Sequence, residues 1–200
     1  MGSEDFNTRL TLLHKIKERD DENAWEDFCT YYDQFIKMVL RRLTISETDI
    51  QDISQVILMQ LWKDLPNFDY DSGKGKFRTW LTRVIKNKAI TYINKNSALK
   101  RKHDHYQEAS PELKTTSDSG LDEIIEDEWK SFISGLAWKE ISKSFSEQVL
   151  KVFELALDGK SNQQIAQLED IKENTVAVYK KRVRAALHKE IIRLNEEYGG

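Results

Sequence analysis

The chain has 200 residues and a formal net charge of −3, with 39% hydrophobic and 32% charged residues. This composition is typical of a globular protein of one or two domains with a polar surface. No apolar run approaches the length of a membrane span, and the single cysteine, Cys29, excludes a disulfide framework within the chain. We therefore expect a cytoplasmic protein.

Helix signals dominate the sequence. Only two prolines and eight glycines occur, and the alternation of β-branched and polar residues that marks strands is missing. We expect an all-α fold of two small helical domains, joined by a flexible acidic linker, in which the C-terminal domain is a helix-turn-helix.

Three helices are predicted before Pro66. The first spans residues 6–18, and the second spans residues 24–43 with an aromatic-rich stripe of helical period. Ser46 and Asp49 form a capping signal for the third helix, which we expect to end near Leu65. The inward stripe of this third helix comprises Ile50, Ile53, Ile57, Leu61 and Leu65.

The opposite face of the third helix mixes charged and apolar side chains. At 3.6 residues per turn, this face carries Asp52, Gln55, Val56, Met59 and Lys63, with Asp49 and Trp62 at its edges. Such a face suits docking on another protein, and it equally suits a solvated surface that tolerates a few apolar residues. The pattern of this helix alone does not decide between the two interpretations.

The segment from residue 72 to residue 102 contains ten basic residues and no acidic residue, although the chain as a whole is acidic. Phe77, Trp80 and Tyr92 are interleaved with these cations. A basic helix with aromatic side chains suits a polyanion whose bases can be stacked. An ordinary surface helix with solvated lysines explains the apolar stripe but not the missing anions. We interpret the helix from Phe77 to about Asn96 as a nucleic-acid surface.

An acidic stretch follows the basic helix. Residues 103–128 contain nine acidic residues against one lysine, and residues 111–120 include a proline and a run of threonine, serine and glycine. We predict that residues 103–120 form a flexible linker. The chain is thereby divided into an N-terminal domain at 1–102 and a C-terminal domain at 121–200.

The C-terminal domain shows a helix-turn-helix pattern. Helices are expected at residues 121–143, 149–157, 162–168 and about 174–196, and a short turn joins the last two. An ordinary αα-hairpin is the alternative. The spacing that packs the last two helices together is supplied by Ile165, Ala166, Ile171 and Val176. Residues projecting from the last helix near its start are expected to reach base edges, and Lys172, Lys180 and Arg184 to contact phosphates.

Three motifs resemble those of bacterial sigma factors, in particular the small two-domain extracytoplasmic-function (ECF) class. Residues 49–55, Asp-Ile-Gln-Asp-Ile-Ser-Gln, with Leu61-Trp62 beyond them, are similar to the helix by which the family binds core RNA polymerase. Residues 75–87, Gly-Lys-Phe-Arg-Thr-Trp-Leu-Thr-Arg-Val-Ile-Lys-Asn, are similar to its −10 promoter segment. Residues 159–176 resemble its −35-reading helix-turn-helix.

The resemblance implies three sets of site residues. Polymerase contact is expected from Asp49, Asp52, Gln55, Val56, Met59, Trp62 and Lys63. Contact with the −10 element is expected from Lys74, Lys76, Phe77, Arg78, Arg83, Lys86, Asn87, Lys88 and Lys95. Contact with the −35 element is expected from Lys172, Asn174, Thr175, Ala177, Val178, Lys181 and Arg182.

The sequence departs from the family pattern at three places. Val56 stands where the family usually has an acidic residue. Glu169 and Asp170 replace the usual Leu-Gly of the turn, so we expect Glu169 to face solvent and Leu168 to take the packing role. Ala177 and Val178 replace a commoner polar pair, which favours contacts with thymine methyl groups over hydrogen bonds.

The implied function is transcription initiation. A sigma factor binds core RNA polymerase, directs it to promoters and helps to open the −10 region, here with the loop at residues 71–76 receiving a flipped base. The implied partners are core polymerase and promoter DNA, and the resemblance leaves open whether an anti-sigma partner exists. We expect no catalytic residue, metal or cofactor. The alternative is a duplex-binding helix-turn-helix regulator that does not bind polymerase stably.

Overall fold

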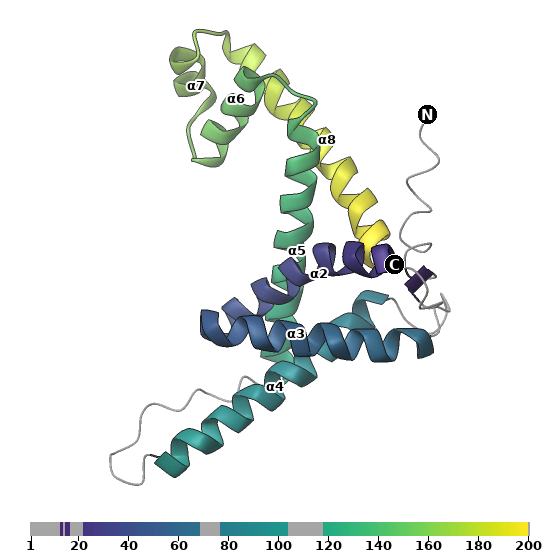
Figure 1. Ribbon diagram of the computed structural model, residues 1–200. Helices are drawn as coiled ribbons and strands as arrows, with labels where there is room; N and C mark the ends of the chain where they lie inside the picture. Colours follow the sequence, from purple (N-terminus) through teal and green to yellow (C-terminus); the bar gives the residue numbers. More distant parts are fainter. Residues whose placement is uncertain (1–12, 14, 17–21, 69–76, 104–117, 200) are drawn as a thin grey trace. The chain divides into compact units, whose positions relative to one another are not determined.

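The computed structural model describes residues 13, 15–16, 22–68, 77–103 and 118–199. Every element within these ranges is a helix, which confirms the predicted all-α class. In chain order the elements are α2 (Glu22–Arg42), α3 (Glu47–Asp64), the 3-10 helix η2 (Leu65–Asn67), α4 (Phe77–His103), α5 (Asp118–Ser142), α6 (Glu147–Leu157), α7 (Asn162–Leu168) and α8 (Glu173–Gly199) (Figure 1).

Several segments predicted from the sequence lie outside the residues that the structure describes. The helix predicted at 6–18 lies outside the described residues, apart from Leu13, Lys15 and Ile16, which are helical. The loop predicted at 71–76 and most of the predicted linker also lie outside the described residues. No helix in the described ranges is long and apolar enough to cross a membrane.

The chain divides into two compact units. The first comprises residues 1–130 with 197–200, and the second comprises residues 131–196. The dividing point lies within α5, so the first half of α5 belongs to the first unit. The domain limits predicted at residues 102 and 121 stay a prediction, because most of the residues between them are outside the described ranges.

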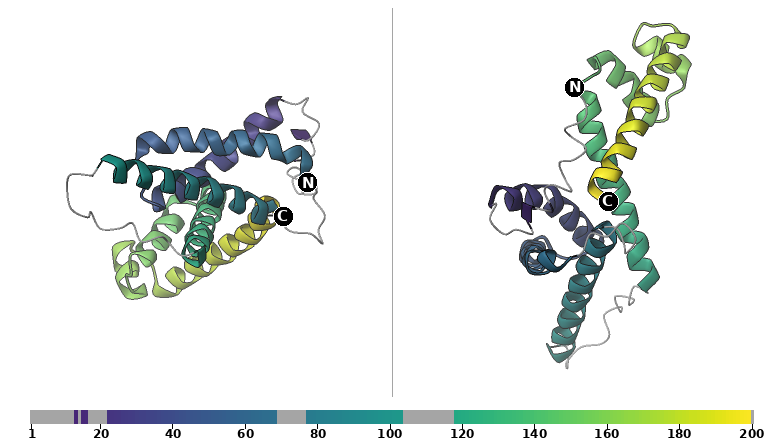
Figure 2. Two further views of the ribbon diagram at one scale, coloured as in Figure 1. Left: turned by 90° about the horizontal axis from the view of Figure 1, so that it is seen from below. Right: turned by 90° about the vertical axis from the view of Figure 1, so that its right-hand side faces the viewer.

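The first unit is built on α3, which packs against both α2 and α4 (Figures 1 and 2). The Ser46 side chain caps α3 by accepting a hydrogen bond from the backbone N–H of Asp49 at 3.3 Å, as predicted. The helix ends at Asp64, where η2 takes the chain through Pro66. The predicted inward stripe is buried throughout: Ile50, Ile53, Ile57, Leu61 and Leu65. Each such side chain stabilises the fold by roughly 1.5–3 kcal/mol.

An aromatic cluster ties α2, η2 and α4 together in this unit. The ring of Phe77 lies 6.0 Å from that of Phe28 and 5.4 Å from that of Tyr32, edge-on in both cases. The ring of Trp80 lies 4.9 Å from that of Phe68 and 5.5 Å from that of Phe77. Because these rings fix the start of α4 against α2 and η2, the basic helix begins at a defined place.

The second unit consists of the second half of α5, α6, α7 and most of α8. One buried cluster includes Ile141, Val149, Phe153 and Val183, and a second joins Val152, Ile165, Ala166 and Val176. The second cluster confirms the predicted packing of α7 against α8, with Ile171 and Tyr179 packed at its edge.

Local signals explain how α6 ends and α7 begins. Gly159 follows α6 with φ +83°, a left-handed conformation that glycine adopts without steric cost. Ser161 and Gln164 then form a capping box for α7, with hydrogen bonds of 2.9 and 3.2 Å between side chains and backbone N–H groups. Both features follow from the sequence.

The turn between α7 and α8 differs from the expectation. Leu168 is 60% exposed, whereas the side chain of Glu169 is only 8% exposed and forms a 2.9 Å ion pair with Lys151 of α6. The prediction that Leu168 packs while Glu169 faces solvent is therefore wrong. The ion pair with Lys151 of α6 holds the Glu169 carboxylate against the protein. The next residue, Asp170, has the left-handed conformation with φ 50°.

Candidate functional site

The outer face of α3 is exposed where the helical period predicts. Asp52, Gln55 and Lys63 face solvent, and the two apolar members, Val56 and Met59, are 49% and 60% exposed. Asp49 and Trp62 are half-buried at its edges. We call these seven residues the α3 face. The two exposed apolar side chains next to one another favour a docking surface over a purely solvated one.

A pocket of about 360 Å³ extends the α3 face towards α2. It is lined by Trp25, Cys29, Gln55, Leu58, Met59, Trp62 and Lys63. The rings of Trp25 and Trp62 meet edge-on at 4.8 Å and form part of its wall. Trp25 and Cys29 were not among the predicted site residues, because the signal that brings them here is the packing of α2 on α3 rather than a motif.

The Cys29 thiol is an uncharged part of this pocket. Burial raises the pKa of Cys29 to about 11, and the carboxylates of Asp33 and Glu26 add to the shift. The thiol is therefore protonated at neutral pH and behaves as a small apolar group. The pocket thus offers an apolar surface with few charges to a partner.

Asp49 joins the α3 face to the basic helix α4. Its carboxylate accepts hydrogen bonds from the hydroxyl of Ser46 and, at 2.7 Å, from the hydroxyl of Tyr92 on α4. These bonds, with Ser46 the larger cause, lower the pKa of Asp49. Burial, and then the nearby Asp49 carboxylate, raise the pKa of Tyr92 to about 12. Asp49 is a link between helices as well as an edge of the α3 face.

Only some of the residues predicted to contact the −10 element are exposed on α4. Arg83, Asn87 and Lys95 are exposed, while Lys88 is half-buried. Phe77 is 1% exposed and lies in the aromatic cluster, so it stabilises the core and offers no face to a base. Lys74 and Lys76 lie outside the described residues.

Arg78 and Lys86 of α4 form ion pairs with acidic residues in the first half of α5, within the same unit. Arg78 pairs with Glu126, and its guanidinium also lies 4.9 Å from the ring centroid of Trp129. Lys86 donates to Asp122 at 2.8 Å. Burial lowers the pKa of Arg78. Two of the acidic residues counted in the sequence therefore neutralise two of the cations predicted to bind DNA.

The recognition surface of the second unit is exposed as predicted. At the start of α8 the exposed residues include Asn174, Ala177, Lys181 and Arg182, and Val178 is 52% exposed. Lys172 in the turn is also exposed, and Thr175 is half-buried. Val176 and Val183, on the opposite side of the helix, are fully buried. We call the outward set the recognition face.

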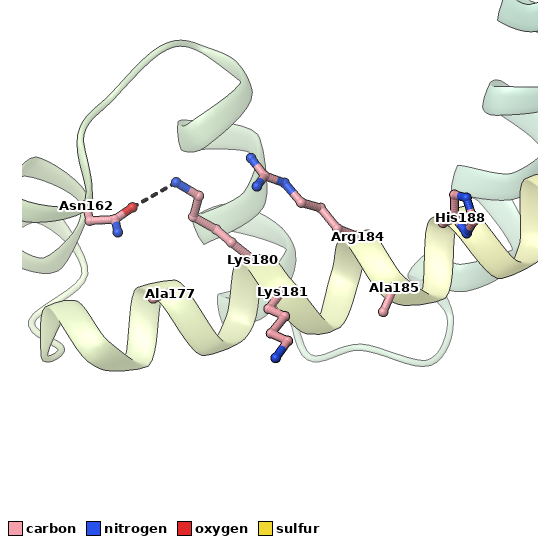
Figure 3. Close-up of a pocket in the computed structure, with 7 residues that line it drawn as sticks. All are labelled: Asn162, Ala177, Lys180, Lys181, Arg184, Ala185 and His188. Carbon is pink, nitrogen blue, oxygen red and sulfur yellow. Dashed lines mark hydrogen bonds between the residues drawn. The ribbon is translucent and has the colours of Figure 1, made fainter.

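A groove of about 550 Å³ lies along α8 beside the recognition face (Figure 3). The residues that line it are Asn162, Ala177, Lys180, Lys181, Arg184, Ala185 and His188. The ammonium group of Lys180 donates to the side-chain oxygen of Asn162 at 2.7 Å, which joins α8 to the start of α7. Of these, Ala177 and Lys181 were predicted to contact the −35 element and Lys180 and Arg184 to contact phosphates, whereas Asn162, Ala185 and His188 were not predicted to contact DNA.

The described residues contain no group of histidine, cysteine and carboxylate side chains arranged to hold a metal ion. The chemistry of the three surfaces is instead that of binding. An apolar pocket with a mixed rim suits a protein partner, and basic helical faces suit nucleic acid.

Two family models match the chain. The model of sigma-70 region 2 matches residues 28–99, which contain most of α2, all of α3 and most of α4. The model of bacterial regulatory proteins of the luxR family matches residues 133–188, which contain the helix-turn-helix. The chain is a sigma factor. The first match confirms the resemblance of the N-terminal half to sigma factors, and the second confirms the helix-turn-helix predicted in the C-terminal half.

Among proteins of known structure, the sigma factor is similar to CnrH. The structure of CnrH in complex with the cytosolic domain of CnrY is 19% identical, with a TM-score of 0.37, over 90% of this chain and 95% of that chain. A TM-score this low supports no inference about the arrangement of the helices. No curated protein matched the sigma factor.

The function of the sigma factor is to bind core RNA polymerase, direct it to promoters and help to open the −10 region for transcription initiation. Its partners are accordingly RNA polymerase and promoter DNA. The families of both matching models are non-enzymatic.

Proposed function

We propose that the α3 face and its adjoining pocket form the polymerase-binding surface of this sigma factor. The observation that carries the proposal is the pair of exposed apolar side chains, Val56 and Met59, beside a pocket lined by Trp25 and Trp62. Exposed apolar and aromatic groups surrounded by polar ones are the usual anatomy of a protein interface. Val56, in place of the acid common in the family, makes this surface more apolar.

We propose further that the two basic surfaces, one on α4 and one on α8, bind promoter DNA. The exposed side of α4, with Arg83, Asn87 and Lys95, follows the backbone of the opened −10 strand. The recognition face enters the major groove at the −35 element, where Asn174 and Arg182 reach base edges and Val178 contacts thymine methyl groups. The sigma factor acts in the bacterial cytoplasm, and none of its residues performs catalysis.

A pair of matched variants tests this division of labour. Met59→Glu places a charge on the α3 face, and Val178→Glu makes the same kind of change on the recognition face. Met59→Glu is expected to weaken binding to purified core polymerase by about tenfold, the effect of losing ~1.4 kcal/mol at an interface. Val178→Glu is expected to leave core affinity unchanged and to weaken binding to duplex promoter DNA.

Fluorescence anisotropy of the labelled sigma factor, titrated with core polymerase, measures the first affinity. Equal core affinities for the wild type and Met59→Glu would show that the α3 face is not the polymerase-binding surface. A sigma factor that binds duplex DNA but has no measurable affinity for core would instead support the duplex-binding regulator.

A further inference from the structure

A series of hydrogen bonds joins the start of α3 to the second half of α4. The side-chain amide of Asn96 donates to the phenol oxygen of Tyr92, and the Tyr92 hydroxyl donates to the Asp49 carboxylate at 2.7 Å. The same carboxylate oxygen accepts a hydrogen bond from the hydroxyl of Ser46, which caps α3. The two helices are therefore tied together at one carboxylate.

The protonation states of the two central groups suit this tie. Burial raises the pKa of Tyr92 to about 12, and the hydrogen bond to Asp49 adds to the shift. The hydrogen bonds from Ser46 and then Tyr92 lower the pKa of Asp49. At neutral pH the phenol thus keeps its proton and the carboxylate its charge. Hydrogen bonds to an ionised acceptor are stronger than those between neutral groups.

The tie lies just beyond the point where the apolar packing of α4 ends. The buried side chains of this helix are Phe77, Leu81, Val84, Ile85 and Ala89. No described side chain of α4 after Ala89 is buried. Beyond Tyr92, the described side chains of α4 form no hydrogen bond or ion pair with another helix. The end of α4 extends past α3 (Figures 1 and 2), so the bond to Asp49 is the last polar restraint on its direction within the described residues.

The part of α4 beyond Tyr92 is rich in positive charge. Four of the ten basic residues between 72 and 102 follow Tyr92 in the chain: Lys95, Lys100, Arg101 and Lys102. The helix continues from Tyr92 to His103, a length of about 17 Å at 1.5 Å per residue. A change of direction by about 10° at Tyr92 would displace its end by about 3 Å, roughly the length of a hydrogen bond. The direction of α4 at Tyr92 therefore decides whether these cations meet a DNA backbone.

We propose that Tyr92 and Asn96 are positioning residues for promoter opening, because their hydrogen bonds to one another and to Asp49 fix the direction in which the basic end of α4 leaves α3. Tyr92 thus orients the helix and does not stack on a base. Asp49 has a second role besides its place at the edge of the α3 face. The inference rests on the proposed role of α4 in following the opened −10 strand.

Tyr92→Phe tests the positioning role, since it removes the hydroxyl and keeps the ring. Promoter opening is measured by the reactivity of unpaired −10 thymines with permanganate, on a promoter whose transcript start depends on the chain, at saturating core polymerase. Opening is expected to fall by about tenfold, because misplacement by about 1 Å can reduce a rate on the order of 100-fold. Core affinity, measured by anisotropy, is expected to stay unchanged.

Two exposed residues of α4 provide a matched pair for double-variant cycles. Arg83 lies between the buried Leu81 and Val84, so core packing holds it in place without the tie. Lys95 lies beyond the tie. Arg83→Gln and Tyr92→Phe are therefore expected to reduce opening by factors that multiply. Lys95→Gln is expected to cost less in the Tyr92→Phe protein than in the wild type, because Lys95 is already displaced there. General destabilisation would not produce this difference.

Asp49→Asn weakens the same tie, so adding it to Tyr92→Phe is expected to cause no further loss of opening. The positioning role is overturned if Tyr92→Phe opens the promoter as the wild type does, if it lowers core affinity and opening equally, or if its effect multiplies with that of Lys95→Gln. The single variants Arg83→Gln and Lys95→Gln report separately on the proposed function. If both open the promoter as the wild type does, the strand-binding role of α4 fails, whatever the result at Tyr92.

Discussion

Asp170 sets the direction in which the chain leaves α7 and enters the recognition helix. Its φ of 50° lies in the left-handed region, which a non-glycine residue enters at a cost of roughly 1–2 kcal/mol. Aspartate tolerates this conformation better than most residues, because its short polar side chain can hydrogen-bond locally. The turn is therefore a place where a single substitution changes the stability of the helix-turn-helix.

Asp170→Ala is expected to lower the free energy of unfolding of the second unit by about 1 kcal/mol, whereas Asp170→Gly is expected to leave it equal or higher. Thermal unfolding followed by circular dichroism measures both. Asp158→Ala is the control, because Asp158 follows α6 with an ordinary φ of −71°. If Ala and Gly at position 170 give the same melting temperature, the left-handed conformation does not limit stability.

The same turn shows how far sequence reasoning reaches at the scale of single residues. The outward positions of Asn174, Ala177 and Arg182 follow from the helical period alone, and the structure confirms them. The inward position of Glu169 does not follow from the helical period, because its partner, Lys151, lies on a different helix. Phe77 shows the same limit, since its motif resembles a DNA-contacting segment while its ring is buried among aromatic neighbours from α2 and η2.

At the scale of elements, α4 and α5 depart most from the predicted boundaries. The sequence predicts that the basic helix ends near Asn96, whereas α4 continues to His103. No glycine or proline occurs between Phe77 and Ser110, so nothing in this segment stops the helix early. Helix α5 begins at Asp118, inside the predicted linker. The type of these two elements is thus well predicted, whereas the end of α4 and the start of α5 are not.

The acidic start of α5 has a consequence for DNA binding by α4. Glu126 pairs with Arg78 across 48 residues of sequence, and Asp122 pairs with Lys86. A pairing over such a separation cannot be read from the charge pattern, although both acidic residues are part of the acidic stretch noted in the sequence. For a DNA strand to contact these two cations, the carboxylates must be displaced.

Glu126→Gln is therefore expected to strengthen binding of labelled single-stranded DNA by the full-length protein, by about two- to fivefold. The gain is small because partly exposed ion pairs contribute only ~0.2–1 kcal/mol. Fluorescence anisotropy at fixed salt concentration measures it. Glu123→Gln makes the same change of charge at an exposed residue that forms no ion pair within the described part of the chain. An equal gain for this variant would show that the effect comes from the change in net charge alone.

At the scale of the whole molecule, the two units carry different parts of one activity. The first unit, matched by the sigma-70 region 2 model, holds the apolar pocket and the basic helix α4. The second unit holds the helix-turn-helix and the groove along α8. The net charge of −3 does not show that the charges are segregated along the chain. Ten cations lie between residues 72 and 102, and nine acidic residues follow between 103 and 128.

The central claim is that this chain makes core RNA polymerase initiate at specific promoters. Purified bacterial core polymerase, transcribing fragmented genomic DNA with and without the chain, tests it when the 5′ ends of the RNA are sequenced. We predict transcripts that appear only with the chain and share sequence elements near −10 and −35, and we predict that Met59→Glu loses them. Transcript starts that are the same with and without the chain would contradict the account.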